Sequence, residues 1–276
     1  MKLNIKLILS FLLLLLGFTS LSAEIVRIMP LGDSITYDDT LADHEGTPRP
    51  SSKRAGYRSH LYYQLTDAGY SFDFVGSRVA GEAVVPAFDP HNEGHPGWTS
   101  YEIGNNIYRY LSQNPADIVL LHIGTNDNDT SVAGVNDILD EIDFYEEHTG
   151  RFVRVIVALV IDRQAQDDLI LAGFNHNLDN LLQRRINSGD AITIVNMYRG
   201  AGLTSADYQD HTHPSDVGYQ KMAQVWFDAL IAPYNTSLHS FPTTLVSRTQ
   251  IRSLNIDEST ETVTFTAYVP DSGITF

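Results

Sequence analysis

Short apolar runs alternate along the chain with longer segments whose apolar residues recur at helical spacing. The runs typical of buried strands span residues 25–31, 72–75, 118–123, 152–161 and 192–195. Helical spacing is found over residues 56–68, 99–111, 138–145, 169–186 and 217–231. Strands that alternate with helices predict a parallel sheet covered by helices on both faces. We therefore predict an α/β fold, a flavodoxin-like three-layer α/β/α sandwich with a five-stranded parallel sheet in the order 2-1-3-4-5.

Two long segments lack this periodicity and are expected to be loops. Residues 38–54 are polar with two prolines, and residues 76–98 are rich in Gly and Pro. At the N-terminus, Lys2 and Lys6 precede an apolar stretch over residues 7–18 and small residues up to Ala23. That layout is typical of a secretory signal peptide, and the stretch is short for a membrane-spanning helix, which is the alternative.

We expect a signal peptide over residues 1–23, one domain over 24–235 and a C-terminal tail over 236–276. Apolar positions within 251–256 and 263–267 predict a hairpin in that tail. The tail is too short for an independent domain. It is either the start of an accessory β-domain or a strand pair packed on the main fold, and the sequence leaves both open.

The charge and the missing cysteines exclude several kinds of function. The chain has 34 acidic and 18 basic residues, a formal net charge of −16, so nucleic acid and anionic membranes are poor partners. It has no cysteine, which excludes disulfides, a Cys nucleophile and thiolate metal sites. His95, His122 and His176 have no partner at metal-ligand spacing, so we interpret them as structural and expect neither metal nor other cofactor. We expect an exported monomer with no stable membrane insertion after signal cleavage.

The candidate nucleophile is Ser34, which follows Gly32 and Asp33 directly after the first predicted strand. A serine hydroxyl needs a base to remove its proton and an acid to orient that base. Residues 210–214, Asp-His-Thr-His-Pro, provide both just before the last helix. Their spacing lets Asp210 accept a hydrogen bond from Nδ1 of His213 while Nε2 faces Ser34. His211 is the rival base, but it is too close to Asp210 for this arrangement.

Two further loops could stabilise the oxyanion of an acyl transfer. Asn126 follows the third predicted strand and has an amide donor, and Gly97 offers an unobstructed backbone N–H. Taken alone, each motif is equally consistent with an ordinary turn or helix cap. In the predicted strand order, however, the loops after strands 1 and 3 open the crevice where ligands bind. No Gly-x-Ser-x-Gly sequence occurs, which disfavours an α/β-hydrolase.

In order along the chain, these motifs resemble the four blocks of the SGNH (GDSL-type) hydrolases. The blocks are Gly32-Asp33-Ser34, the Gly97 loop, Gly124-Thr125-Asn126-Asp127 and Asp210-x-x-His213-Pro214, and the resemblance covers roughly residues 25–232. It implies Ser34 as nucleophile, His213 as base and Asp210 as its orienting acid. It also implies an oxyanion hole made by the backbone N–H groups of Ser34 and Gly97 and the side chain of Asn126.

Finer motifs resemble carbohydrate esterase family three, whose members deacetylate xylan. They are residues 27–34, 56–58, 73–77, 93–98 and 218–223. Residues 161–164 lack the proline-rich loop expected there, and the loop at 38–54 is individual to this chain.

The resemblance implies a secreted serine esterase that hydrolyses O-acetyl esters on a polysaccharide or oligosaccharide such as acetylated xylan. The alternatives are a lipolytic or thioester hydrolase of the same superfamily and a non-catalytic carbohydrate-binding protein. Trp98 and Tyr37 are candidates for stacking on a sugar, and Arg58 is expected to order the site loops or a helix end.

Overall fold

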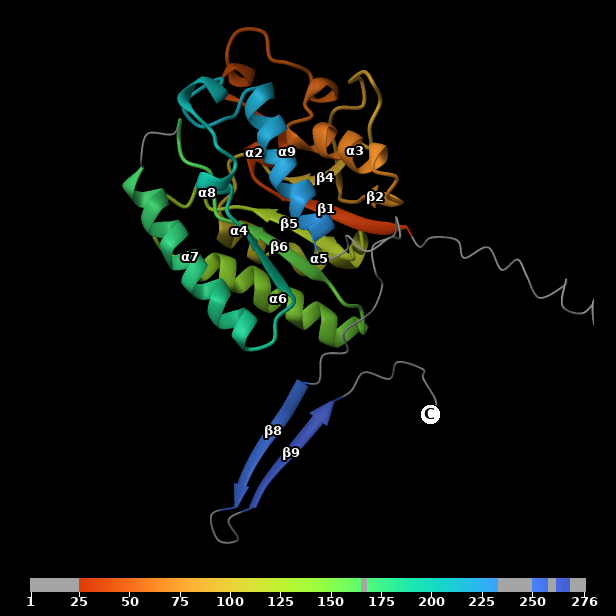
Figure 1. Ribbon diagram of the computed structural model, residues 1–276, viewed down its shortest axis with the longest axis vertical. Coiled ribbons are helices and arrows are strands. Elements are labelled where there is room, and N and C mark those ends of the chain that lie inside the picture. The colour runs from red at the N-terminus through yellow and green to blue at the C-terminus, as the bar shows by residue number, and fades with distance from the viewer. Residues whose placement is uncertain (1–24, 165–167, 233–249, 258–261, 269–276) are drawn as a thin grey trace, which may run out of the picture.

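The computed structural model describes residues 25–164, 168–232, 250–257 and 262–268 (Figure 1). Its central sheet has seven strands in the order β3-β4-β1-β5-β6-β7, and β2 also pairs with β1. The strands are β1 (Val26–Gly32), β2 (Phe72–Phe74), β3 (Arg78–Val79), β4 (His91–Gly94), β5 (Ile118–His122), β6 (Arg154–Ala158) and β7 (Ile192–Val195). The β3–β4 pair is antiparallel and the other pairings of this sheet are parallel.

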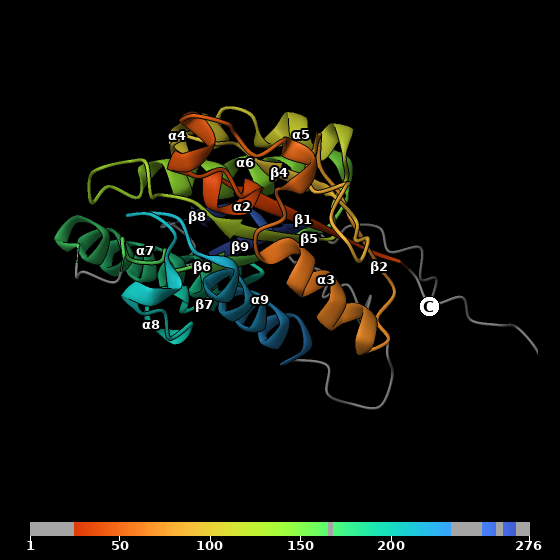
Figure 2. The ribbon, with the colours of Figure 1, turned by 90° about the horizontal axis from the view of Figure 1, so that it is seen from above.

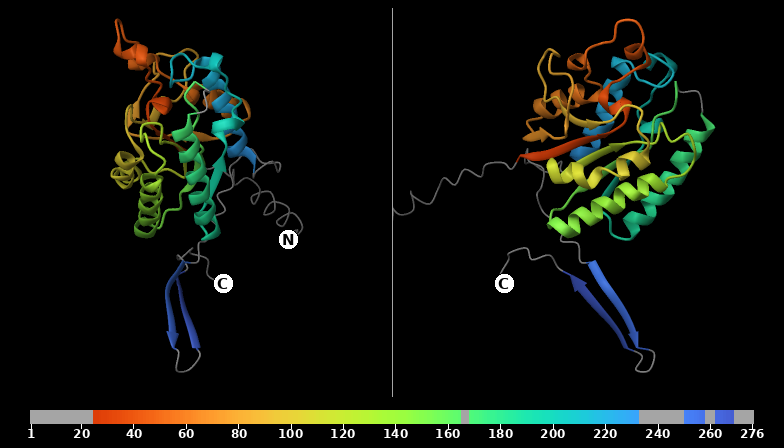
Figure 3. Two further views of the ribbon diagram at one scale, coloured as in Figure 1. Left: turned by 90° about the vertical axis from the view of Figure 1, so that its left-hand side faces the viewer. Right: turned by 180° about the vertical axis from the view of Figure 1, so that it is seen from behind.

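Helices cover both faces of the sheet, as the alternating pattern predicts. They are α2 (Ser34–Tyr37), α3 (Tyr57–Asp67), α4 (Ser100–Gly104), α5 (Ile107–Gln113), α6 (Ala133–Thr149), α7 (Leu169–Asn187), α8 (Met197–Gly200) and α9 (Asp216–Ile231). Figure 2 shows α4, α5 and α6 above the sheet and α3 and α9 below it, and Figure 3 shows α5 and α6 in front of the strands when the molecule is viewed from behind.

Two apolar cores follow from the alternation of side chains along the buried strands. In β1, Ile28 faces the core shared with α3 and α9, where Trp226 is fully buried. Met29 and Leu31 face the second core, which α4, α5, α6 and α7 complete. Because both faces of this parallel sheet are buried, successive residues of a strand are apolar, which explains the continuous apolar runs.

The prediction of five strands is wrong, because the segment at 76–98 contains β3 and β4. The sequence of β4 is His-Asn-Glu-Gly, which has no apolar pattern, yet Asn92 and Glu93 are fully buried. Their polar atoms are satisfied locally: Asn92 Nδ2 donates to the Pro90 carbonyl at 3.1 Å, and Glu93 accepts from Ser77. A strand buried through polar side chains gives no hydrophobic signal, so the pattern missed it.

Two other expected elements are shorter than the sequence predicts. The helix expected over 99–111 is divided into α4 and α5 at Asn105 and Asn106, residues of low helix propensity that follow Gly104. The capping box of Thr99 with Glu102 is present at the start of α4. The strand expected over 152–161 ends at Ala158, because the N–H of Val160 binds the Asn175 side chain at 2.7 Å instead of continuing the strand pairing.

In the C-terminal tail, β8 (Gln250–Asp257) and β9 (Thr262–Tyr268) form a separate antiparallel two-stranded sheet, so the predicted hairpin strands are present. The predicted signal peptide, residues 1–23, lies outside the described residues. Among the residues that are described, no helix is both long and apolar enough to cross a membrane.

Three neighbouring strands end at the same level of the sheet, and this positions the candidate site. In the register, Gly32 of β1 lies opposite Gly94 of β4 and His122 of β5. A Cβ atom at Gly32 would lie 2.2 Å from the His122 carbonyl oxygen, so only glycine permits this close approach. The loops that follow these strands therefore leave the sheet side by side.

Candidate active site

Ser34 is the first residue of α2, which begins immediately after β1. Asp33 caps this helix, because its Oδ1 accepts the N–H of Ile35 at 2.9 Å. The serine is nearly buried, with 9% of its surface exposed. This turn therefore holds the hydroxyl at the carboxyl end of the sheet while leaving it a small opening to solvent.

The structure places His213 against Ser34, 179 residues earlier in the chain. Nε2 of His213 lies 2.9 Å from the serine Oγ. Nδ1 of the same ring lies 3.0 Å and 2.9 Å from the two carboxylate oxygens of Asp210. With the ring proton on Nδ1, donated to Asp210, Nε2 is free to accept the serine proton. The rival base His211 is exposed, and the structure places no contact between it and Ser34 within the described residues.

Backbone contacts hold the loop that carries His213. The N–H of Gln209 donates to the His213 carbonyl at 3.0 Å, and Tyr208 pairs with Pro214 in an antiparallel bridge. Ser215 then caps α9 by accepting the N–H of Gly218. The histidine is thus fixed between a closed loop and a helix start.

Asp210 is held in its ionised form by backbone donors. Its oxygens accept the N–H groups of Thr212 and His213 at 2.8 Å and that of Leu41 at 2.9 Å. Burial raises the pKa of this carboxyl, but the three backbone N–H groups and the His213 side chain together lower it more, so the pKa lies below its usual value. A carboxylate is therefore available to orient the imidazole at neutral pH.

The contact from Leu41 comes from the loop at 38–54, which the sequence analysis did not connect to the site. Ion pairs fold this loop: Arg49 binds Asp38 and Asp43, at 3.1 Å and 2.8 Å, and Arg54 pairs with Asp39. Figure 1 shows the loop (orange) at the same end of the molecule as the segment before α9 (teal). The many Asp and Arg residues of this loop could have indicated that it is folded by ion pairs, but they did not indicate that it contacts Asp210.

Gly97 lies in a tight turn directly after β4. The N–H of Trp98 donates to the His95 carbonyl at 3.1 Å, Pro96 and Gly97 occupy the two central positions, and φ of Gly97 is +80°. These features define a type II turn, which requires a positive φ at its third residue. The N–H of His95 donates to the Gly32 carbonyl at 2.8 Å, so the turn is attached to the residue two before Ser34.

Asn126 follows β5 and reaches the same turn. Its Nδ2 donates to the Trp98 carbonyl at 2.9 Å. An amide nitrogen carries two hydrogens, so one N–H remains for another acceptor. Arg163 supports the loop by donating to the Thr125 carbonyl and to the Asn128 side chain, at 2.8 Å and 2.9 Å.

Arg58 is fully buried and joins the elements around the site through backbone carbonyls. It donates to Thr36 and Tyr37 at the end of α2, at 2.9 Å and 3.3 Å. It also donates to Arg54, Ala80 and Pro90. Burial lowers its pKa to about 10, so the guanidinium stays charged at neutral pH. Arg58 thus contacts a helix end and loops rather than solvent.

Asp33 was not singled out from the sequence as more than part of a motif. Its carboxyl is fully buried, and burial raises its pKa from 3.8 to about 7, against the N–H of Ile35, which lowers it. The charge of Asp127 raises it further. The residue before the candidate nucleophile therefore titrates near neutral pH.

The three histidines expected to be structural differ in their surroundings: His176 Nε2 lies 3.1 Å from Nδ2 of Asn180, and His122 Nε2 accepts the N–H of Ile161 at 3.3 Å. His95 Nε2 lies 2.7 Å from Glu93, and its ring stacks between Trp98 and Tyr110. His122 is fully buried, and burial lowers its pKa to about 4. In the described ranges, no group of three or more His, Cys, Asp or Glu side chains is placed to hold a metal ion.

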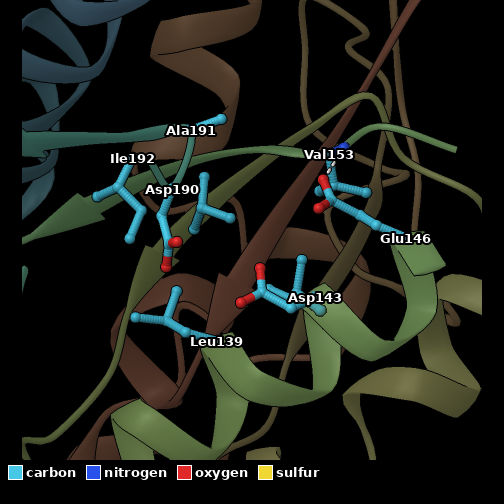
Figure 4. A pocket seen from close by; sticks show the side chains of 9 residues that line it. Leu139, Asp143, Glu146, Val153, Asp190, Ala191 and Ile192 are labelled. Atoms are coloured by element: carbon cyan, nitrogen blue, oxygen red, sulfur yellow. Dashed lines mark hydrogen bonds between the residues drawn. The ribbon is translucent and has the colours of Figure 1, made fainter. Parts of the chain in front are cut away.

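Two hollows differ in their relation to the candidate site. One has a volume of about 540 Å³ and is lined by residues of α2, the Gly97 turn, α5 and the segment at 77–79. The other, of about 10 Å³, lies between α6 and the starts of β6 and β7, with Asp143, Glu146 and Asp190 around it (Figure 4). It lies at the starts of the strands, whereas Ser34 lies at their carboxyl ends, and its volume suits one water molecule.

Comparison with known proteins identifies a family and several similar structures. A sequence model of the GDSL-like lipase/acylhydrolase family matches residues 28–226. A family 3 carbohydrate esterase of Clostridium thermocellum has a similar structure, with a TM-score of 0.63 and 29% identity over 76% of this chain and 97% of that one. A serine-to-alanine variant of an acetyl esterase, solved with an acetate ion, matches with a TM-score of 0.62 and 28% identity over 76% and 98% of the two chains.

A multidomain esterase of Ruminococcus flavefaciens is 28% identical in an alignment of 243 positions that covers 76% of this chain. The chain spans 29% of the length of that relative.

Proposed function

The chain belongs to the GDSL-like lipase/acylhydrolase family and is a carboxylic ester hydrolase, and we propose that it removes O-acetyl groups from a carbohydrate through an acyl-enzyme on Ser34. The observation that carries this proposal is the 2.9 Å contact between Ser34 Oγ and His213 Nε2, with Asp210 bound to the other ring nitrogen.

In the proposed reaction, Nε2 of His213 takes the hydroxyl proton as Ser34 Oγ bonds to the ester carbonyl carbon. His213 returns that proton to the sugar oxygen when the bond to the alcohol breaks. A water molecule then attacks the acetyl-serine with His213 again as base, and acetate leaves. Asp210 keeps the ring in the tautomer that this sequence needs and stabilises its charged form.

The carbonyl oxygen becomes negatively charged in each tetrahedral intermediate. We assign three donors to that oxygen: the N–H of Ser34, which begins α2 and has no intrahelical acceptor, the N–H of Gly97, and the remaining N–H of Asn126. Two contacts support this assignment, because His95 attaches the Gly97 turn to Gly32 and Asn126 binds the Trp98 carbonyl next to Gly97. The loss of one such donor typically costs about 10²–10³ in kcat.

Two observations support a small acyl group on a sugar. The similar structures include a family 3 carbohydrate esterase and an acetyl esterase with acetate. In addition, Ser77, Arg78 and Arg109 line part of the 540 Å³ pocket, and such polar groups suit the sugar that carries the ester. We therefore expect higher kcat/KM on acetyl than on octanoyl esters.

We further propose export of the protein, supported by the pattern of Lys2, Lys6 and the apolar residues 7–18. Expression of the full chain with mass determination of the released product tests this, because cleavage after Ala23 gives a defined mass.

The test of the reaction compares Ser34→Ala and His213→Ala with His211→Ala in p-nitrophenyl acetate hydrolysis. The first two variants are expected to lose at least about 10³ in kcat while keeping the circular dichroism of the wild type. His211→Ala is the matched control, because this exposed histidine lies two residues away, and it should keep full activity. Turnover by folded Ser34→Ala or His213→Ala at the wild-type rate would contradict the mechanism.

A further inference from the structure

Some residues that line the 540 Å³ pocket are close in the sequence to those of the proposed oxyanion hole. Trp98, which lines it, follows Gly97 and accepts the Asn126 amide on its carbonyl. Tyr37, on another wall, ends the one-turn helix that Ser34 begins. A substrate whose ester lies at Ser34 would therefore extend toward this pocket.

The pocket is lined by two arginines, Arg78 and Arg109, that form no ion pair within the described part of the chain. The guanidinium of Arg78 lies 4.6 Å from the centre of the Tyr37 ring, and that of Arg109 lies 5.0 Å from the centre of the Tyr110 ring. Arg109 also donates to Asn106 at 2.9 Å. Neither arginine forms an ion pair with a carboxylate of the described residues, in contrast to Arg27, Arg49, Arg54, Arg163, Arg185 and Arg199.

The pocket keeps a net positive charge when the nearest acid is counted. Its described lining includes no Asp or Glu. Glu93 is fully buried beneath it, and its carboxylate accepts from Ser77 and His95. Burial and Glu93 raise the pKa of the Tyr110 phenol, while Arg109 and Arg78 lower it, so all three charges act on one phenol. Counted with the lining residue His95 neutral, two arginines and one glutamate leave a single positive charge.

We propose that this pocket binds the carboxylate of a uronic acid residue in the acetylated glycan. The inference rests on the proposed esterase function and specifies its substrate class. Planar guanidinium groups match a carboxylate in geometry, and the single net charge suits a singly charged ligand better than a phosphate dianion. The half-buried ring of Trp98 adds apolar surface beside the sugar. On a chain with a net charge of −16, this local positive charge offsets the repulsion that an acidic glycan meets elsewhere.

The proposal predicts a selective effect on substrate binding. Arg78 and Arg109 are remote from the reacting atoms, so their contacts would be equally strong in the ground and transition states. Loss of one charged contact should raise KM for an acidic substrate about tenfold with kcat unchanged. Since Arg109 is exposed, part of this preference should weaken at high salt.

The experiment measures acetate release from two acetylated oligosaccharides that differ only in a uronic acid or the corresponding neutral sugar. Arg78→Gln and Arg109→Gln are compared with the wild type and with Arg151→Gln, an exposed arginine in the loop between α6 and β6. The wild type and Arg151→Gln should prefer the acidic substrate, and both pocket variants should lose that preference while keeping their KM for the neutral one.

Hydrolysis of p-nitrophenyl acetate separates this proposal from the proposed function. If the wild type hydrolyses that neutral ester but shows no preference for the uronic acid substrate, the pocket proposal is wrong and the esterase proposal stands. A preference that survives in both pocket variants also overturns the pocket proposal. If the wild type hydrolyses no acetyl ester at all, the esterase function itself fails.

Discussion

Asp210→Asn tests the geometry of the candidate triad most directly, because the described residues offer its carboxylate only donors. Four N–H groups point at its two oxygens: those of Leu41, Thr212 and His213 and the imidazole Nδ1–H of His213. Asparagine has one accepting oxygen and one donating NH₂ group. In one orientation this NH₂ faces Leu41, and in the other it faces Thr212 and His213. Neither orientation satisfies all four donors.

The number of unsatisfied donors allows the effects on stability and on kcat to be estimated. At least one backbone N–H loses its acceptor, and because the Leu41 contact is exposed to water this should lower the free energy of unfolding by only about 0.5–1.5 kcal/mol. Replacement of the acid in a serine–histidine–aspartate triad by its amide typically lowers kcat by about 10⁴, because the imidazole is no longer held in the productive tautomer. The loss in rate should thus far exceed what the loss in stability alone produces.

Initial rates with p-nitrophenyl acetate and urea unfolding measure the two effects separately. Asp216→Asn is the matched control, since Asp216 also pairs with a histidine, His60 at 3.0 Å, but its side chain is 89% exposed. This control should keep full activity and lose less than about 1 kcal/mol. If Asp210→Asn is folded and its kcat stays within tenfold of the wild type, the orienting role of Asp210 is refuted.

The pH dependence of stability provides a second readout of the same change. The pKa of Asp210 is lowered in the folded state, so its contribution to stability is present above the ordinary value of 3.8. That contribution disappears as the pH falls through the folded-state value. In Asp210→Asn this part of the acid destabilisation should be absent.

Two further predictions concern the neighbours of Ser34. Gly97→Ala and Gly150→Ala place alanine at φ of +80° and +68° with no atom within 4 Å of the new Cβ, so both should lose about 1–2 kcal/mol of stability, measured by urea unfolding. Alanine keeps the backbone N–H, but relief of the positive φ would turn this proposed oxyanion donor away, so Gly97→Ala should also lower kcat and Gly150→Ala should not. Equal rates in the two variants would show that the rate does not depend on the conformation of the Gly97 turn. The second prediction concerns Asp33, whose pKa is raised from 3.8 to about 7 in the folded state. Between these two values the folded protein holds a proton that the unfolded protein releases. The free energy of unfolding should therefore fall by up to about 4 kcal/mol as the pH rises from about 4 to 7. Asp33→Asn, which keeps an oxygen for the N–H of Ile35, should lack this decline, and parallel pH curves for variant and wild type would contradict the assignment.

Elements with regular periodicity could be predicted from the sequence alone. The apolar runs of β1, β5 and β7 and the helical stripes of α3, α7 and α9 are found within a few residues of their expected positions. Burial on both faces requires continuous apolar runs in parallel strands, and one buried face requires a 3.6-residue repeat in helices. These requirements act within each segment, so a local pattern is sufficient to detect them.

The polar strand β4 could not be predicted in this way. Glu93 and Asn92 are buried because Ser77 and the Pro90 carbonyl satisfy them, and neither contact leaves a periodic trace. The same holds for Arg58, whose position depends on five carbonyl oxygens from four separate segments. A buried polar group is stable only with its partners in place, and those partners are chosen by the fold.

For the candidate site, the sequence by itself determined which chemical groups are present and where they leave the sheet. Ser34 follows the first strand, Asn126 follows β5, and the three-residue spacing of Asp210 and His213 brings acid and imidazole together. The geometry of such short spacings and strand ends depends on neighbouring residues only, so the residue types found there indicate the possible chemistry of the site.

Only the tertiary structure decided how these groups are held and what lies beside them. It brought His213 within 2.9 Å of Ser34, placed the Leu41 N–H on Asp210, and attached the Gly97 turn to Gly32 through β4. It also gathered Arg78 and Arg109 around one pocket. Each of these contacts joins segments far apart in the chain, and their free energy depends on relative positions that no local pattern encodes.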